Sequence, residues 1–246
     1  MMEWLLRLAA RGARVGAVGA TNEEQRRSWL ETALRSIPTG TRILDAGAGE
    51  LANRPLCSHL QYVSQDLCEY DGLGDRAGLH THSWDTTKID IVSDIAAIPE
   101  PDASFGAVLC SEVLEHVPDP LGALKEFHRL LSTAGTLILT APFSSLTHFA
   151  PYHFSSGFSR YFFQYHLGRL GFELVELVPN GNFFDFLAQE LRRVPSVAER
   201  YTAGKLSAAD LSALKLALRV VGKLRETDRG SDDLLCFGYH VLAHKR

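Results

Sequence analysis

The sequence predicts an α/β fold built on a parallel sheet, and two kinds of observation predict it. Short apolar runs of strand length alternate along the chain with segments of helical periodicity, which is typical of strands joined by right-handed helical crossovers. Three of these runs end at an aspartate, namely Asp45, Asp66 and Asp94. Because ligands of such sheets bind beyond the carboxyl ends of the strands, these three acids are expected to line one crevice.

The composition is that of a globular protein with a sizeable core. The chain has 246 residues, of which 46% are hydrophobic and 22% are charged. A net charge of −4 does not favour binding to a phosphate backbone, so no nucleic-acid partner is expected. The four cysteines show no C-x-x-C spacing, which indicates reduced thiols and a cytoplasmic protein. No signal peptide and no membrane span are expected.

Residues 1–37 are expected to form N-terminal helices. The apolar positions among residues 4–9 fit one face of an amphipathic helix. Packing on its own domain is the favoured role for this helix, and a membrane-surface or dimer helix is the alternative. A second helix is expected to open at the capping sequence of residues 21–24 and to end near Ile37.

The remaining elements are expected to follow in alternation. The strands are predicted at residues 42–46, 61–65, 89–93, 106–110, 136–140, 173–177 and 232–243. The helices are predicted from residue 50 to near residues 55–58 and at residues 121–131, 158–170, 183–193 and 206–224. A long loop at residues 67–88 and an aromatic, histidine-containing loop at residues 143–157 complete the chain.

A glycine turn directly after the first strand indicates a nucleotide-type cradle. Gly47 and Gly49 follow residues 42–46 at once, and glycine lets a backbone turn tightly and approach a ligand closely. A helix beginning near Glu50 would point its first amide N–H groups at that ligand.

Two ligand classes use such a turn. The spacing of Gly47, Gly49 and Ala52 formally satisfies the dinucleotide pattern, so an NAD-dependent oxidoreductase is one alternative. However, Asp45 precedes the first glycine by two residues, and a carboxylate there suits a ligand with an ammonium group and repels a pyrophosphate.

Three segments resemble one enzyme family. Residues 44–49 resemble motif I of the class I S-adenosylmethionine (SAM) methyltransferases. Residues 105–120 closely resemble the segment around strand four of the methyltransferase-11 group, which includes the ubiquinone-biosynthesis O-methyltransferases, and residues 131–137 resemble the motif before their fifth strand. The resemblance covers about residues 43–143 and recurs weakly at residues 171–176 and in the last strand.

This resemblance implies a Rossmann-like, seven-stranded, mostly parallel sheet with an antiparallel last strand and helices on both faces. It also implies that S-adenosyl-L-methionine is the cofactor and S-adenosyl-L-homocysteine the product. The methyltransferase domain is expected to span residues 38–246. Strands six and seven of the family form a hairpin, but here residues 181–231 intervene with two amphipathic helical patterns. We expect this helical insertion to form a cap beside the acceptor pocket.

The expected cofactor site combines the glycine turn with the acids at the strand ends. Asp45 suits the ammonium group of SAM, Asp66 can accept hydrogen bonds from both ribose hydroxyls, and Asp94 can accept one from the adenine amino group. The full set of expected cofactor-binding residues is Asp45, Ala46, Gly47, Gly49, Asp66, Leu67, Asp94, Ile95, Ser111 and Glu112.

Methyl transfer needs an aligned acceptor and, for an oxygen or nitrogen acceptor, a base. His116, His148 and His153 are the expected catalytic residues, because histidine can hold a proton near neutral pH. The aromatic loop that carries His148 and His153 suits a small-molecule acceptor, and a hydroxyl of a sugar or phenolic metabolite is favoured.

Other functions stay open at this point. Glu112, Glu115 and His116 form an E-x-x-E-H sequence that also occurs in small-RNA 3′-end 2′-O-methyltransferases, where it helps to bind a divalent metal. A metal-assisted RNA 2′-O-methyltransferase is therefore an alternative, although no metal is expected here. A non-catalytic SAM-binding partner protein is another alternative, and a homodimer is left open.

Overall fold

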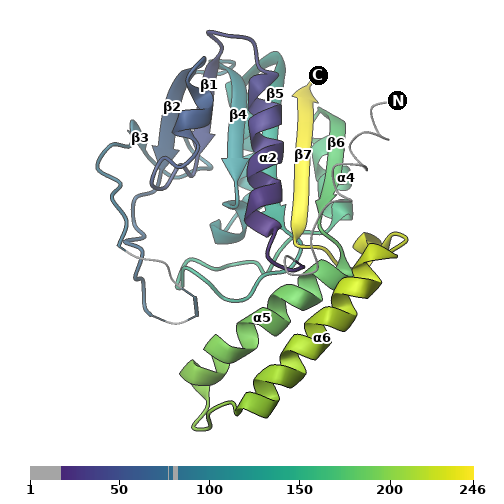
Figure 1. The fold of residues 1–246 in the computed structure, drawn as a ribbon. Coiled ribbons are helices and arrows are strands. Elements are labelled where there is room, and N and C mark those ends of the chain that lie inside the picture. The colour runs from purple at the N-terminus through teal and green to yellow at the C-terminus, as the bar shows by residue number, and fades with distance from the viewer. Residues whose placement is uncertain (1–17, 77, 80–82) are drawn as a thin grey trace. The chain divides into compact units, whose positions relative to one another are not determined.

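The computed structural model describes residues 18–76, 78–79 and 83–246, and its centre is a seven-stranded sheet (Figure 1). The strands lie in the order β3-β2-β1-β4-β5-β7-β6. Their bounds are β1 (Arg42–Ala46), β2 (Gln61–Asp66), β3 (Ile91–Val92), β4 (Phe105–Ser111), β5 (Leu131–Pro142), β6 (Phe172–Asn180) and β7 (Gly238–Lys245). The β1–β2, β1–β4, β2–β3 and β4–β5 pairs are parallel, whereas β7 runs antiparallel to β5. The expected Rossmann-like sheet with an antiparallel last strand is therefore confirmed.

Strand β1 lies at the middle of the parallel part because it is apolar on both faces. Leu44 is fully buried and pairs with Val63 of β2 on one side and with Val108 of β4 on the other. A strand buried on both faces needs a nearly continuous apolar run, and this is what the sequence offers here.

Five α-helices and three short 3₁₀ helices are present in the described part of the chain. They are α2 (Asn22–Arg35), α3 (Pro120–Leu130), α4 (Arg160–Arg169), α5 (Phe183–Tyr201) and α6 (Ala208–Glu226), with short 3₁₀ helices η3 (Arg54–Cys57), η4 (Leu114–His116) and η5 (Ser231–Asp233). None of the helices in the described part of the chain is both long and apolar enough to cross a bilayer.

The chain divides into two compact units. Arg26–Val178 together with Gly238–Arg246 form the unit that contains nearly the whole sheet. The described part of the other unit consists of residues 18–25 and of Pro179–Phe237, which contains α5 and α6.

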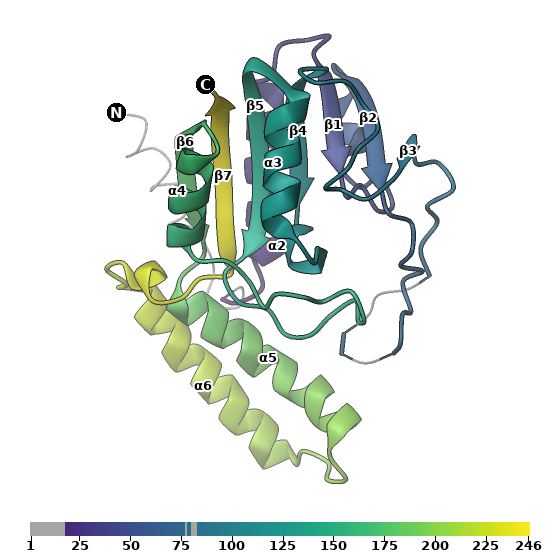
Figure 2. The same cartoon turned by 180° about the vertical axis from the view of Figure 1, so that it is seen from behind.

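Helices cover both faces of the sheet, with α2 on one face (Figure 1) and α3 and α4 on the other (Figure 2). Leu30, Ala33 and Leu34 of α2 are buried in one apolar cluster with Ile43 of β1 and Ile138 of β5. The second predicted helix is therefore confirmed, and Trp29 is partly buried against the same cluster.

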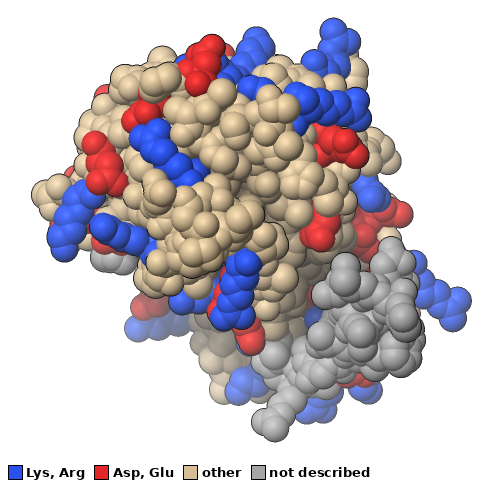
Figure 3. Space-filling model, turned by 90° about the horizontal axis from the view of Figure 1, so that it is seen from above, with Lys and Arg blue, Asp and Glu red and all other residues tan. Residues whose placement is uncertain are grey.

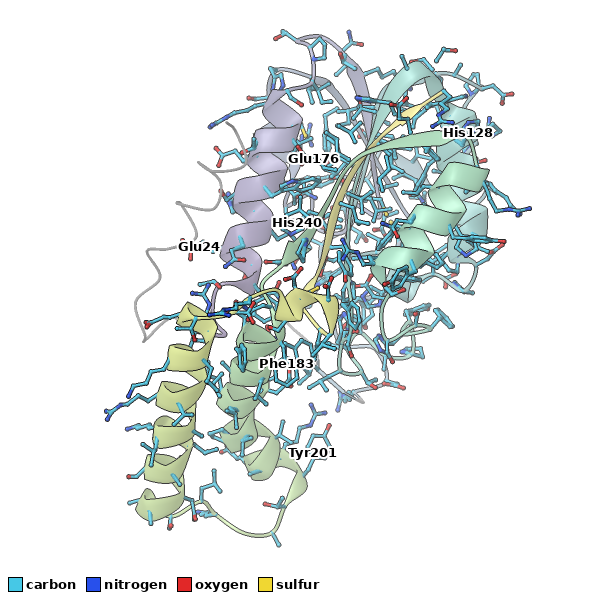
Figure 4. The ribbon with its side chains drawn as sticks, turned by 90° about the vertical axis from the view of Figure 1, so that its right-hand side faces the viewer. Glu24, His128, Glu176, Phe183, Tyr201 and His240 are labelled. Atoms are coloured by element: carbon cyan, nitrogen blue, oxygen red, sulfur yellow. The ribbon has the colours of Figure 1, made fainter. Side chains whose placement is uncertain are left out.

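Trp29 also joins α2 to the far strands of the sheet. Its ring stacks on His240 of β7 with a centroid distance of 4.9 Å, and its Nε1 donates to Glu176 of β6 at 3.2 Å. Figure 4 shows Glu176 and His240 beside α2. Burial, followed by the nearby Arg26, lowers the pKa of His240 to about 3, so this ring is neutral at pH 7.

The second unit contains the helical hairpin of α5 and α6. Val18, Ala188 and Val221 form its buried cluster. Asp185 of α5 accepts a hydrogen bond from Nε of Arg225 of α6 at 2.6 Å, and the two side chains form a nearly buried ion pair. Both helices predicted in the insertion are confirmed; α5 runs on to Tyr201, which Figure 4 labels at the end opposite Phe183.

The prediction of an α-helix beginning at Glu50 is wrong. After β1 the chain makes turns in which Leu51 has a φ of +61°, and only the 3₁₀ helix η3 follows. A left-handed residue cannot continue a right-handed helix, and Pro55 then opens the short η3. The expected helix N-terminus at the cradle is therefore absent from this part of the structure. Instead, the amides of Gly47 and Ala48 donate to the carbonyl of Gln65 at 2.9 Å.

Several predicted boundaries also shift. β3 contains only Ile91 and Val92. Helix α3 passes directly into β5 at Leu131, so β5 begins before its predicted start at residue 136 and contains Ala134, which has a φ of +60°. β7 begins at Gly238 because η5 occupies the residues predicted to start it. The helix predicted at residues 4–9 lies outside the described residues.

Asp45 at the end of β1 is a buried acid. Its Oδ2 accepts a hydrogen bond from the hydroxyl of Tyr62 on β2 at 2.6 Å. Burial raises the pKa of Asp45 from 3.8 to about 6, with a smaller contribution from Asp66 and opposing hydrogen bonds from Tyr62 and Asn53. The ionised form is thus less stable in the folded protein than in the unfolded chain, and stability falls as the pH rises from 4 to 6.

We predict that Asp45→Asn raises the free energy of unfolding above pH 6 by up to roughly 3 kcal/mol, the cost that corresponds to this pKa difference. The asparagine oxygen can still accept from Tyr62. Urea unfolding between pH 4 and pH 8 should show the two proteins converging toward pH 4. Asp102→Asn, at an exposed carboxylate, is the control. A gain for Asp45→Asn that does not change with pH would contradict the assignment.

Candidate functional site

A pocket lies at the carboxyl ends of the parallel strands, inside the unit that contains the sheet. Its wall comes from residues that follow β1, β2, β3 and β4, together with residues of the long loop after β2 and of the loop after β5. This is the edge at which the sequence predicts a ligand site.

The glycine turn shapes the floor of the pocket. Gly47 lines the pocket with a φ of +76°, and a Cβ atom there would lie 2.5 and 2.6 Å from the two Cγ atoms of Val113. Only glycine fits this position. The amide of Gly49 donates to Oδ2 of Asp66 at 2.9 Å, and the amide of Cys68 donates to Oδ1 of Asp66 at 2.8 Å. Asp66 is therefore held between two loops at the pocket wall.

A second carboxylate lies further along the same edge. Asp94 and Ile95 line the pocket, and Oδ1 of Asp94 accepts from the amide of Ala96 at 2.8 Å. Leu67 also lines the pocket and is 44% exposed. The structure thus brings together Asp66, Leu67, Asp94 and Ile95, as the sequence predicts.

Glu112 lines the pocket from the end of β4 in an unusual conformation. It has a φ of +55°, which is uncommon for a residue with a side chain and recurs at functional sites. Its amide donates to the carbonyl of Thr140, and its carboxylate forms an ion pair with Arg26 at 3.0 Å.

Four of the predicted cofactor residues do not line the pocket. Asp45 and Ala46 are buried within β1. The hydroxyl of Ser111 lies 2.9 Å from that of Thr140. Gly49 does not line the pocket, but its amide donates a hydrogen bond to Asp66, which does. Asp45 was expected to meet the ammonium group of SAM; its bond to Tyr62 instead places it within the sheet.

Aromatic side chains that were not predicted from the sequence to bind a ligand complete the pocket wall. Tyr70, Trp84, Phe149 and Tyr152 all line the pocket. The centroid of the Tyr70 ring lies 5.0 Å from those of Trp84 and Phe149, and Trp84 lies 5.2 Å from Phe149. Aromatic faces attract cations and stack on flat ligands. The aromatic character of residues 143–157 was a signal for two of these side chains, but Tyr70 and Trp84 lie in a loop without periodicity.

The three predicted catalytic histidines come together. The ring centroids of His116 and His148 are 4.6 Å apart, those of His148 and His153 are 4.9 Å apart, and those of His116 and His153 are 6.0 Å apart. His116 belongs to η4 and lines the pocket, whereas His148 and His153 belong to the loop between β5 and α4.

The surroundings of His116 fix its protonation state. Its Nδ1 lies 2.5 Å from the carbonyl oxygen of Tyr152, so Nδ1 carries the hydrogen and Nε2 keeps its lone pair. Burial, with a further contribution from His148, lowers the pKa of His116 to about 4, and the ring is neutral at pH 7. Next to it, burial and the neighbouring Glu112 hold the pKa of the Glu115 carboxyl well above its usual range.

One face of the protein carries charges of both signs. In Figure 3, the basic and acidic side chains are interspersed over the visible described surface rather than gathered into one basic stripe.

Comparisons with known proteins show which family the chain belongs to. A family model described as a methyltransferase domain matches residues 18–218. The ubiquinone biosynthesis O-methyltransferase of Xanthomonas campestris pv. campestris (strain B100) is 35% identical over 111 residues, which are 44% of this chain and 46% of that protein. The chain thus matches about half the length of this curated relative.

Solved structures share the fold. The [4+2]-cyclase SpnF has a TM-score of 0.54 at 17% identity, with 90% of this chain and 80% of that chain covered. A SAM-dependent methyltransferase from Archaeoglobus fulgidus has a TM-score of 0.51 at 18% identity, with 89% and 94% covered. The family model covers most of the chain, and it confirms the family resemblance predicted from the sequence. The chain therefore belongs to the methyltransferase domain family.

Proposed function

We propose that this enzyme transfers a methyl group to a hydroxyl of a small-molecule acceptor, with a sugar or a phenolic metabolite as the favoured class. The observation that carries the proposal is the neutral His116 ring at the pocket wall, whose Nε2 is buried without a hydrogen-bond partner. A hydroxyl must lose its proton to be methylated, and such a nitrogen can accept it.

The residues of the pocket fit the cofactor. Each carboxylate oxygen of Asp66 accepts one backbone N–H and has a further lone pair for a ribose hydroxyl. Asp94 suits the adenine amino group, and Glu112 is better placed than Asp45 for the ammonium group because it lines the pocket. When bound, SAM supplies a methyl group on a sulfonium, which is a good leaving group.

The chain's own residues would align the acceptor and exclude water. Tyr70, Phe149 and Tyr152 offer apolar faces for a flat acceptor next to His116. The Xanthomonas campestris relative is named as an O-methyltransferase, which supports oxygen as the acceptor atom. The acidic net charge and the mixed charges in Figure 3 favour a small molecule over RNA. A cytoplasmic location, a homodimer and the cap at residues 181–231 stay predictions.

Asp66→Ala should weaken SAM binding on the order of 10- to 100-fold, because hydrogen bonds to a charged group contribute about 1.5–3 kcal/mol. Calorimetry with SAM measures the change. Asp90→Ala is the matched control, because Asp90 also accepts a backbone N–H from β2 but does not line the pocket. Equal SAM affinity in wild type and Asp66→Ala would contradict the role of Asp66.

The acceptor class can be tested with labelled SAM and pairs of compounds that differ only in carrying a hydroxyl or an amine. The label is expected on the hydroxyl member of a phenol or sugar pair. Transfer only to amines, or preferentially to an RNA oligonucleotide, would overturn the proposed acceptor.

His116→Gln should lower kcat by roughly 10²- to 10⁴-fold, the usual contribution of a positioned base, and should leave SAM affinity within a few-fold. Single-turnover methyl transfer measures the rate. His166→Gln, at a histidine of α4 outside the pocket, is the control. An unchanged rate in His116→Gln would show that the cluster does not act on the acceptor proton.

A further inference from the structure

Three imidazoles converge beside the pocket in a way that packing alone does not explain. His116, His148 and His153 each offer a ring nitrogen, and these three nitrogens lie within 4.8 Å of one another. The side chains come from η4 and from the loop between β5 and α4, two segments that are distant in sequence. No metal was expected from the sequence, but three ring nitrogens this close together resemble the ligands of a metal site.

Backbone carbonyls determine which nitrogen of two of the rings faces inward. Nδ1 of His116 lies 2.5 Å from the carbonyl oxygen of Tyr152, and Nδ1 of His148 lies 2.9 Å from that of Leu146. Each Nδ1 therefore donates its hydrogen to the backbone, which leaves the lone pair on Nε2. Metal-binding histidines are held in this manner, with the second ring nitrogen donating to a carbonyl or a carboxylate.

A buried carboxylate faces the same two nitrogens. Oε1 of Glu115 lies 3.7 Å from Nε2 of His116 and 3.9 Å from Nε2 of His148, and the Glu115 side chain is 1% exposed. Ligand atoms around a tetrahedral zinc ion lie about 3.3 Å apart, given bonds of about 2.0–2.1 Å, so metal binding would draw the three ring nitrogens and the Glu115 carboxylate closer together.

The cluster also contains polar atoms that lack a partner. Oε2 of Glu115, Nε2 of His116 and Nδ1 of His153 are buried without a hydrogen bond. Burying such atoms unpaired is costly, and a cation in their midst would compensate for it.

We propose that Glu115, His116, His148 and His153 bind one divalent transition-metal ion, with Zn²⁺ as the first candidate. Imidazole nitrogens with one carboxylate suit Zn²⁺, whereas Mg²⁺ and Ca²⁺ prefer sites made of oxygen atoms.

The ion would join η4 to the loop that places Phe149 and Tyr152 on the pocket wall. Its catalytic consequence, unlike its binding, rests on the proposed function. With the ion bound, Nε2 of His116 would be a metal ligand, so it would act as the base only in the metal-free protein. In the metal-bound protein an acceptor hydroxyl would enter as a fifth ligand and form an oxygen–metal bond. The cation lowers the pKa of the hydroxyl, so its O–H bond would break, with the proton passing to solvent before methyl transfer.

Metal binding can be measured without any assay of turnover. The full-length protein is stripped with a chelator and titrated with Co²⁺, whose visible absorption reports tetrahedral coordination, and Zn²⁺ is then added as competitor. The expected result is one Co²⁺ per chain, displaced by Zn²⁺. His148→Asn and His153→Gln should each weaken Co²⁺ binding by more than the roughly 10- to 100-fold that loss of an outer partner costs.

His128→Gln is the matched control, because His128 packs on Phe172 away from the cluster and is labelled in Figure 4. Circular dichroism of each stripped variant shows whether it is folded, and Glu115→Gln provides a further variant that preserves side-chain shape. Equal Co²⁺ affinity in wild type and in the folded His148→Asn and His153→Gln variants would overturn the site.

Turnover then separates this inference from the proposed function. Methyl transfer to hydroxyl acceptors by the stripped protein, with no Co²⁺ spectrum, would overturn the metal site and leave the proposed function intact. A Co²⁺ spectrum that depends on the histidines, with label transferred only to amines, would support the site and overturn the hydroxyl acceptor.

Discussion

The close approach of Gly47 to Val113 is the constraint on which the site depends. It brings the end of β1 against the end of β4, with less room between them than a single Cβ atom needs. Because the backbone turns there in the left-handed region, the next amides bond to β2 and to Asp66 instead of starting a helix. The pocket therefore owes its shape to one residue without a side chain and to hydrogen bonds between loops, and not to a helix dipole.

Much of the fold could be predicted from the sequence because the relevant signals are local. Strand β1 and helix α2 were predicted correctly. Burial on both faces gives β1 a continuous apolar run, and burial on one face gives α2 apolar residues at helical spacing. The helix predicted after Gly49 was wrong because Leu51 adopts a left-handed conformation, which the sequence pattern does not indicate. The direct passage from α3 to β5 was hidden for a similar reason, since Ala134-Gly135 resembles an ordinary helix end.

In the candidate site, too, the residues marked by local sequence features could be predicted and those brought together by tertiary packing could not. Asp66 and Asp94 could be assigned because strand ends are local features that a parallel sheet brings to one edge. Asp45 followed the same rule but does not line the pocket; its side chain is buried and accepts a hydrogen bond from Tyr62 of the neighbouring strand. The aromatic wall could not be predicted, because Tyr70 and Trp84 meet Phe149 only through tertiary packing of two irregular loops. The histidines were identified one by one, and their convergence is likewise a product of tertiary structure.

The adjacency of β6 and β7 in the sheet affects which evolutionary changes the fold can accept. The chain leaves the sheet at β6 and returns in the adjacent strand, and the amide of Phe237 donates to the carbonyl of Asn180 at 2.9 Å where the two ends meet. Because the sheet holds both ends together, lengthening the segment between them adds only a slowly growing entropic cost. The segment that contains α5 and α6 could therefore be lengthened, shortened or replaced during evolution without changing the register of the other strands.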